Sequence, residues 1–163
     1  TAQGLASLKN CPSLRRLYIH DIRLAGDELE WLSSQTNLEA LSLQRTGING
    51  NVLKNIKAAD TLKVLNLSGN DINDKDMDSI VLFKGLEVLA LADTKITGAG
   101  IAKLEGMARL NELNVANCAI QDADLEYFLS MPNLRIVYAE GCGIGDMAVE
   151  QMRYRFPMLA IFR

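Results

Sequence analysis

The feature that most constrains this sequence is an internal repeat of 24 residues. Units that begin at residues 14, 38, 62, 86, 110 and 134 keep six positions apolar, with no insertion or deletion between them. Three of these positions follow the spacing Leu-x-x-Leu-x-Leu, as in LKVLNL at 62–67. The other three lie 10, 15 and 18 residues into the unit, as Ile96, Ile101 and Leu104 do in the fourth unit. A fixed period of this length predicts a fold made by stacking one structural unit.

Each unit contains two different hydrophobic periods. The last two leucines of the first group are two residues apart, so they lie on one face of a short strand. A cluster of turn-forming residues follows, such as NDINDKD at 70–76, whose residue types suit tight turns and helix N-caps. The second half spaces its apolar residues by about three, as one face of a short helix does. We therefore predict the order strand, turn, helix, turn in every unit.

Stacking these units predicts a single α/β domain, because no unit can bury its apolar side alone. Parallel strands would form the concave side, and the wider helices the convex side, of a right-handed superhelix. The expected boundaries are a partial repeat over 1–13, six repeats over 14–157 and a C-terminal cap strand over 158–163. Solenoids need a polar cap at each end, and none precedes the partial repeat. We therefore expect the chain to be a fragment of a longer protein.

The repeat also resembles a known family. LKVLNLSGNDI (62–72) and LNELNVANCAI (110–120) match the leucine-rich repeat pattern L-x-x-L-x-L-x-x-N/C/T-x-I/L. The resemblance covers essentially the whole chain and is to bacterial-type repeats of 24 residues, with a more distant likeness to the repeats that follow eukaryotic F-box domains. It implies the solenoid fold described above. It does not identify a partner, because members of the family bind very diverse proteins.

The resemblance implies a structural role for the column eight residues into each unit, where the family side chain points inward and bonds loop backbone. We expect Thr46, Asn70, Thr94, Cys118 and Cys142 to form this ladder, since asparagine and threonine make such bonds well and cysteine weakly. Ile22 departs from the pattern, so the first unit is expected to have a differently built turn. A disulfide between Cys118 and Cys142 on adjacent units remains an alternative.

Composition excludes several classes of function. The net charge is −3, which argues against general binding of nucleic acid or anionic membranes, because both use a concentrated basic surface. No apolar run approaches the roughly 18 residues needed to span a bilayer. Three cysteines, an odd number, do not make a disulfide framework, and nothing here indicates a compartment.

Few residues could carry catalytic or metal chemistry. His20 is the only histidine, and Asp21 beside it points to the opposite face of a strand. No nucleophile elbow, zinc motif or phosphate-binding loop occurs, so we expect no enzyme, no cofactor and no metal. Four aspartates at 71–78 could bind calcium, but they fail the EF-hand spacing and fit the start of a helix better.

The residues between the core leucines should face the concave side and form a surface for a protein or peptide partner. Its middle is small and nearly uncharged, and its two ends carry larger polar and aromatic side chains, which are favoured at interfaces. The expected contact residues are Arg16, Tyr18, His20, Val64, Val88, Tyr138 and Glu140. The alternative is a structural spacer or targeting appendage of a larger, possibly enzymatic, protein. The oligomeric state stays open.

Three further side chains carry expectations about packing. Trp31 and Tyr127 fall in a mostly polar column of the helices, so we expect both to be partly exposed on the convex side. Cys11 is expected to fill the gap under the first helix.

Overall fold

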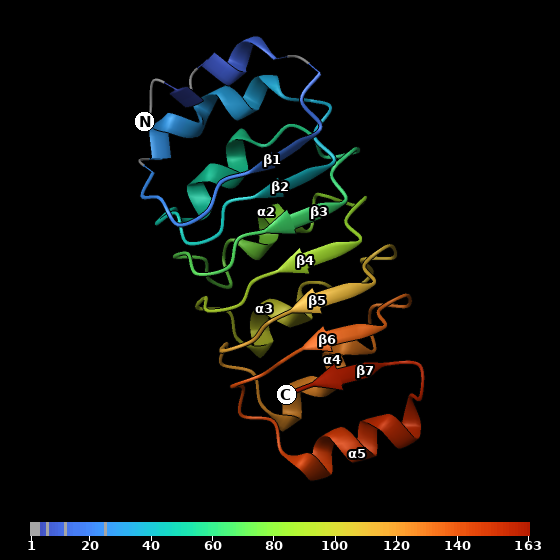
Figure 1. The fold of residues 1–163 in the computed structure, drawn as a ribbon. Coiled ribbons are helices and arrows are strands. Elements are labelled where there is room, and N and C mark those ends of the chain that lie inside the picture. The colour runs from blue at the N-terminus through green and yellow to red at the C-terminus, as the bar shows by residue number, and fades with distance from the viewer. Residues whose placement is uncertain (1–3, 6, 12, 25) are drawn as a thin grey trace.

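A computed structural model of the chain describes residues 4–5, 7–11, 13–24 and 26–163. These residues contain one parallel sheet in which the strands follow each other in chain order (Figure 1). Each strand is three residues long. The strands are β1 (Arg16–Tyr18), β2 (Ala40–Ser42), β3 (Val64–Asn66), β4 (Val88–Ala90), β5 (Glu112–Asn114), β6 (Ile136–Tyr138) and β7 (Ala160–Phe162).

The pairing register equals the sequence period. Leu41 pairs with Leu65 and Leu65 with Leu89, a step of 24 residues, and every other pair of neighbouring strands shows the same step. The columns read from the sequence are therefore physical columns that run across the sheet. This confirms the predicted α/β solenoid with an all-parallel sheet.

The second half of each unit forms a short helical segment, and these segments lie behind the sheet in the view of Figure 1. The first two units use 3₁₀ helices and the later ones mainly α-helices. An apolar spacing of about three is compatible with both types. The 3₁₀ segments are η1 (Ser7–Asn10), η2 (Gly26–Ser34), η3 (Gly50–Asn55) and η4 (Asp122–Asp124). The α-helices are α2 (Met77–Ile80), α3 (Gly98–Ala102), α4 (Leu125–Phe128) and α5 (Asp146–Arg155).

One continuous hydrophobic core lies between the sheet and the helical segments. The leucine columns and the apolar helix positions of the third to fifth units are almost completely buried, as are Leu89, Ile96 and Leu104 of the fourth. Leu5 and Leu8 of the partial first repeat are half-buried against the same core. In the part of the chain described, no helix is both long enough and apolar enough to cross a bilayer.

Two expectations about packing are wrong and one is confirmed. Trp31 is buried in the core, because it lies in η2, which packs against η3. Cys11 is exposed, because it follows η1 in a turn where its N–H bonds the Leu8 carbonyl oxygen. Tyr127 is exposed, as expected.

Candidate protein-binding surface

The exposed face of the sheet is built from three columns of side chains, which we call the concave wall. Strand alternation places these side chains opposite the core leucines. The first column is Arg16, Ala40, Val64, Val88, Glu112, Ile136 and Ala160, the second is Tyr18, Ser42, Asn66, Ala90, Asn114, Tyr138 and Phe162, and the third is His20, Gln44, Ser68, Ala92, Ala116 and Glu140.

The middle of the concave wall is shallow and apolar. Val64, Val88 and Ala90 are half-buried, so each still presents part of its surface to solvent. The β2 residues depart from this pattern, since Ala40 and Ser42 are buried beneath their neighbours. The apolar middle therefore begins at β3 and continues to Ala116.

The end of the wall at β1 is polar and aromatic. Tyr18 is 59% exposed, and its ring meets the ring of His20 edge-on at 6.4 Å. His20 also bonds the next strand, with its Nε2 2.7 Å from Oγ of Ser42. Arg16 is exposed beside them, so these three predicted contact residues do lie together at one end.

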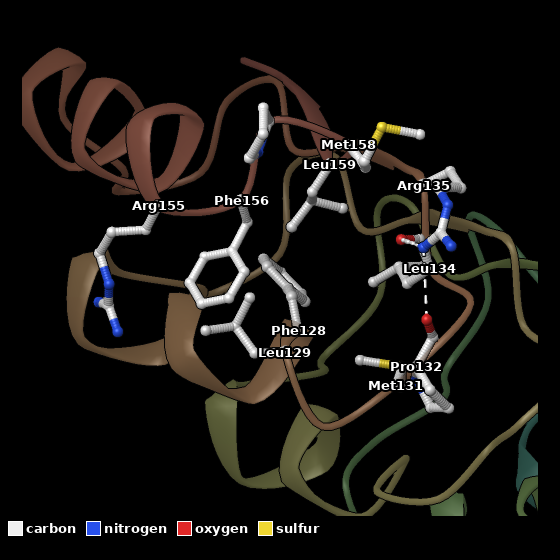
Figure 2. Close-up of a pocket in the computed structure, with 11 residues that line it drawn as sticks. Phe128, Leu129, Met131, Pro132, Leu134, Arg135, Arg155, Phe156, Met158 and Leu159 are labelled. Carbon is white, nitrogen blue, oxygen red and sulfur yellow. Dashed lines mark hydrogen bonds between the residues drawn. The ribbon is translucent and has the colours of Figure 1, made fainter.

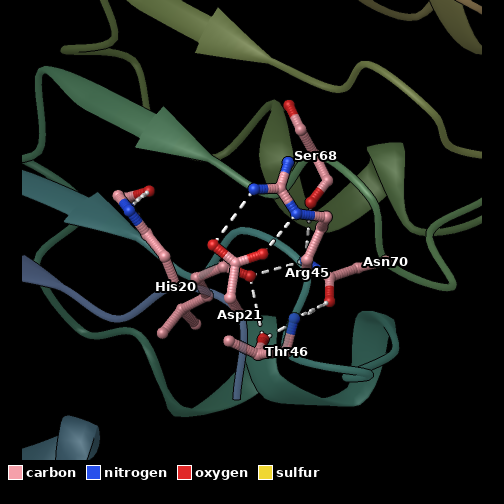
Figure 3. A network of polar contacts seen from close by, with 8 residues as sticks. His20, Asp21, Arg45, Thr46, Ser68 and Asn70 are labelled. Carbon is pink, nitrogen blue, oxygen red and sulfur yellow. Dashed lines mark hydrogen bonds and ion pairs between the residues drawn. The ribbon is translucent and has the colours of Figure 1, made fainter. Parts of the chain in front are cut away.

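A network at the end of β1 explains why His20 and Asp21 do not form a catalytic pair (Figure 3). The Asp21 carboxylate turns to Arg45 of the next unit and accepts two hydrogen bonds from its guanidinium, at 2.5 and 3.0 Å. These bonds lower the pKa of Asp21 and raise the pKa of Arg45. Ser42 is buried, so the His20–Ser42 pair has neither an acid to orient it nor an accessible hydroxyl.

The other end of the wall is made by β6 and β7. The rings of Tyr138 and Phe162 stack with centroids 5.3 Å apart and planes 19° from parallel. Glu140 is exposed just beyond β6. Phe162 falls in the column of Tyr18 and Tyr138 and was not among the predicted contact residues.

Asn70 is the most heavily bonded member of the inward ladder (Figure 3). Its Oδ1 accepts from the backbone N–H groups of Thr46 at 3.0 Å and Ile48 at 3.3 Å. Its Nδ2 donates to the carbonyl oxygens of Leu43 at 2.6 Å and Leu67 at 2.9 Å. One buried amide thus joins the turns of the second and third units.

The remaining ladder residues each donate to a carbonyl oxygen at a strand end. Thr46 and Thr94 bond their own unit, to Leu43 and Leu91. Cys118 and Cys142 bond the preceding unit, with sulfur 3.1 Å from the Leu91 oxygen and 3.2 Å from the Val115 oxygen. Both cysteines are free, and burial raises the pKa of the Cys142 thiol. Ile22 is exposed and makes the first turn different, as its sequence suggests.

The aspartates at 71–78 all have protein partners, which accounts for them without calcium. Two make ion pairs with lysines of the next unit, and two accept hydrogen bonds from backbone N–H groups near helix starts. The pairs are Asp71–Lys95, Asp78–Lys103, Asp76–Asn73 and Asp74–Thr97. The described residues contain no cluster that could hold a metal ion.

The structure also shows a column that the sequence analysis missed. Seven residues into each unit, the backbone takes a positive φ of 50° to 71°. The residues are Asp21, Arg45, Gly69, Asp93, Asn117 and Gly141. Five of the six are glycine, asparagine or aspartate, the residue types that best tolerate this region, so the sequence pattern could have predicted the column. It turns the chain sharply after each of the strands β1 to β6.

A cavity of about 240 Å³ lies between the fifth unit and the C-terminal segment (Figure 2). Phe128, Leu129 and Phe156 form its apolar lining. Arg155 at its mouth is paired with Glu126, and Nη1 of Arg135 bonds backbone carbonyls. The cavity is smaller than most ligand pockets, and both arginine side chains that line it already have bonding partners in the protein. We therefore interpret it as a packing gap.

Comparison with known proteins identifies the architecture. A family model described as Leucine Rich repeat matches residues 60–81 and 109–129, which lie in the third and fifth units. Together with the parallel sheet in a 24-residue register, this match identifies the units as leucine-rich repeats. The chain is a leucine-rich repeat protein.

A solved structure of internalin C2 from Listeria monocytogenes is similar to this leucine-rich repeat protein, with a TM-score of 0.69 and 18% identity. The match covers 94% of this chain and 63% of the internalin chain, so this chain spans less than two thirds of that protein. No curated protein sequence matches. Significant structural matches number 182 chains, and a fold so widely shared does not by itself name a partner.

Proposed function

We propose that this leucine-rich repeat protein binds a protein or peptide partner on the concave wall. Leucine-rich repeats generally mediate protein binding, and the finer assignment to this face is our own. It gives the exposed Tyr18 and the half-buried Val64, Val88 and Tyr138 a common role.

The observation that carries the proposal is an open apolar strip between two aromatic ends. The helical segments all lie on the opposite face of the sheet, so none of the described elements covers Val64, Val88 or Ala90 (Figure 1). Tyrosine at both ends supplies large contact area with few rotatable bonds, which is typical of binding surfaces. A partner could bury the strip without any rearrangement of the sheet.

The proposal is tested by filling the strip with large charged side chains. Ala90→Arg with Ala116→Arg would block the wall while leaving the core leucines unchanged. Affinity capture from lysate and medium, read by mass spectrometry, should recover a partner with the wild type and lose it with this pair.

The matched control is Ala99→Arg with Ala123→Arg, the same chemical change at exposed positions near the helix starts. This control should keep the partner, provided that all three proteins unfold at similar temperatures. Equal capture by all three would reject the concave wall. That result would favour the alternative, a structural spacer or targeting appendage, whose role does not need the wall residues.

A further inference from the structure

The concave wall carries charges of opposite sign at its two ends. Arg16 lies at β1, while Glu112 lies on β5 and Glu140 just beyond β6. Between them, the wall side chains of the second, third and fourth units are all uncharged. The two ends of the wall therefore differ in charge, with a basic end at β1 and an acidic end at β5–β6.

These wall charges have no ion-pair partner among the described residues. No Asp or Glu of the described residues lies within 4.0 Å of the Arg16 guanidinium, and no Lys, Arg or His of them within 4.0 Å of Glu112 or Glu140. Some charges at the edges of the sheet and at the turns do pair from one unit to the next, as Asp21 does with Arg45. Unpaired charge of fixed sign at the two ends of an apolar strip is available to a partner.

The neighbouring column at the strand starts does not cancel this polarity. One residue before each wall strand, the sign of the charge alternates along the sheet. The residues are Arg15, Glu39, Lys63, Glu87 and, after the uncharged Asn111, Arg135. The five charges of this row sum to +1, which is less than the two carboxylates that Glu112 and Glu140 contribute, and the first two members of the row already pair.

We propose that the wall takes an amphipathic helix of a partner protein, with an acidic end beside Arg16 and a basic end beside Glu112 and Glu140. The inference rests on the proposed function and names the chemistry of its partner. Rungs of the sheet are ~4.8 Å apart, so five steps from β1 to β6 span roughly 24 Å. A helix that rises 1.5 Å per residue covers this distance with about 16 residues.

A helix fits the wall better than an extended segment. Strands β2 to β6 are each paired with a strand on both sides, so their backbone N–H and C=O groups are not free to pair with an added strand. A helix satisfies its own backbone and needs only side-chain contact. The small side chains of Ala90, Ala92 and Ala116 let a helix approach closely, and Tyr18 stands at the β1 end.

The test uses three labelled peptides of about 16 residues that share one Leu/Ala stripe. The first has Glu in its first turn and Lys in its last, the second has Glu in both, and the third has Lys in both. A peptide with the two ends exchanged is not used, because a helix can simply turn around on the wall. Fluorescence anisotropy at low salt should show that the wild type binds the mixed peptide about threefold or more tighter than either uniform peptide.

Glu140→Lys should reduce the preference for the mixed peptide over the peptide with Glu at both ends, because a lysine at this position offsets the charge of Glu112. Glu105→Lys makes the same change in net charge at an exposed convex position and should leave the order unchanged. Equal binding of the three peptides, no binding by the wild type, or an order that Glu105→Lys shifts equally would each overturn the inference.

Failure of this inference can be told apart from failure of the proposed function. A partner that is captured by the wild type, lost with the Ala90→Arg and Ala116→Arg pair and retained by Glu140→Lys and Arg16→Glu would keep the wall as the binding face. It would also show that the polarity of the wall does not select the partner. Loss of that partner with either charge reversal, together with the peptide order above, supports the inference.

Discussion

At the scale of single residues, the most informative side chain is Asn70. The sequence places it in the ladder column, yet only the structure shows that it serves the turn of the preceding unit as well as its own. Threonine and cysteine in the same column donate to a carbonyl oxygen but have no amide to satisfy two N–H groups and two carbonyls together. The third unit therefore holds the strongest single fixing point of the ladder.

Asn70→Ala should lower the free energy of unfolding by roughly 3 kcal/mol. The change leaves the N–H groups of Thr46 and Ile48 buried without this acceptor, and each unsatisfied buried group costs about 1–3 kcal/mol. Urea unfolding followed by circular dichroism measures the loss. Asn51→Ala at an exposed position is the control and should change little. A loss below about 1 kcal/mol for Asn70→Ala would contradict the role assigned to the amide.

Asp21 predicts a pH dependence of stability at the β1 end. Its pKa is lowered from 3.8 by the bonds from Arg45, so its contribution is present above pH 3.8 and is lost as the pH falls through the folded value. Asn tolerates the positive φ of this position, so Asp21→Asn removes the charge without straining the turn. Thermal unfolding should find the wild type slightly more stable at pH 7, with the gap closed near pH 2. A gap that is unchanged at acid pH would reject the ion pair as its cause.

At the scale of elements, the helix starts of successive units interlock through glycine and aspartate. A Cβ added to Gly98 at the start of α3 would lie 1.8 Å from Oδ1 of Asp124 in the next unit. The same relation joins Gly50 at the start of η3 to Asp76. Each of these aspartates meanwhile accepts a backbone N–H of its own unit, from Gln121 and from Asn73. Glycine in one unit makes room for the capping acid of the next.

This interlock predicts that the effect of Gly98→Ala depends on Asp124. In the wild type the new methyl group would push the carboxylate from its bond with the Gln121 N–H and cost about 1–3 kcal/mol. In an Asp124→Ala background the methyl group has space, and the same change should be close to neutral. Unfolding free energies of the four proteins give the coupling as a double-mutant cycle. A cost of equal size in both backgrounds would show that the two side chains do not interact.

The elements also show what sequence reasoning can and cannot supply. The 24-residue columns predicted the strands, their parallel order and the core leucines, because burial imposes a period that no single substitution hides. The helical type could not be read, since apolar spacing of about three suits η3 as well as α3. Contacts between units were also out of reach. Asp74 occurs in a cluster that looks like the cap of its own helix, yet its carboxylate binds the backbone of Thr97 in the next unit.

The candidate surface was only partly predictable for a similar reason. Strand alternation placed Tyr18, Val64 and Val88 on the exposed face, and their exposure agrees with that placement. Strand alternation does not predict how much of each side chain its neighbours bury. The burial of Ser42, which contacts His20, could therefore not be predicted. Alternation also missed the stack of Tyr138 on Phe162, which depends on a strand with only one neighbour.

At the scale of the whole molecule, the fold is a one-dimensional stack. Each unit contacts the units before and after it, so its stability is approximately its own plus two interface terms. A unit near the end of the described sheet is held by fewer neighbours than one in the middle. The sixth unit should therefore open at a lower denaturant concentration than the fifth, and the three cysteines provide natural reporters of where opening occurs.

Thiol labelling in rising urea should modify the cysteines in the order Cys11, Cys142, Cys118. Cys11 is exposed and should react without urea. Cys142 lies between the fifth and sixth units and is half-buried with a raised pKa, so it should resist labelling until the sixth unit opens. Cys118 lies one interface further in, between the fourth and fifth units, and should need more urea. Alkylation at pH 8, with each site quantified by mass spectrometry, gives a separate urea midpoint for each cysteine.

Ile161→Ala sharpens this experiment. Ile161 packs in the core from β7 and pairs with Val137 of the sixth unit, so its truncation weakens the last interface directly. The variant should lower the midpoint for Cys142 while leaving that for Cys118 nearly unchanged, because the interface that protects Cys118 is one unit away. A common midpoint for both cysteines, shifted equally by Ile161→Ala, would mean instead that the whole stack opens as one cooperative body and that coupling between units exceeds the stability of any single unit.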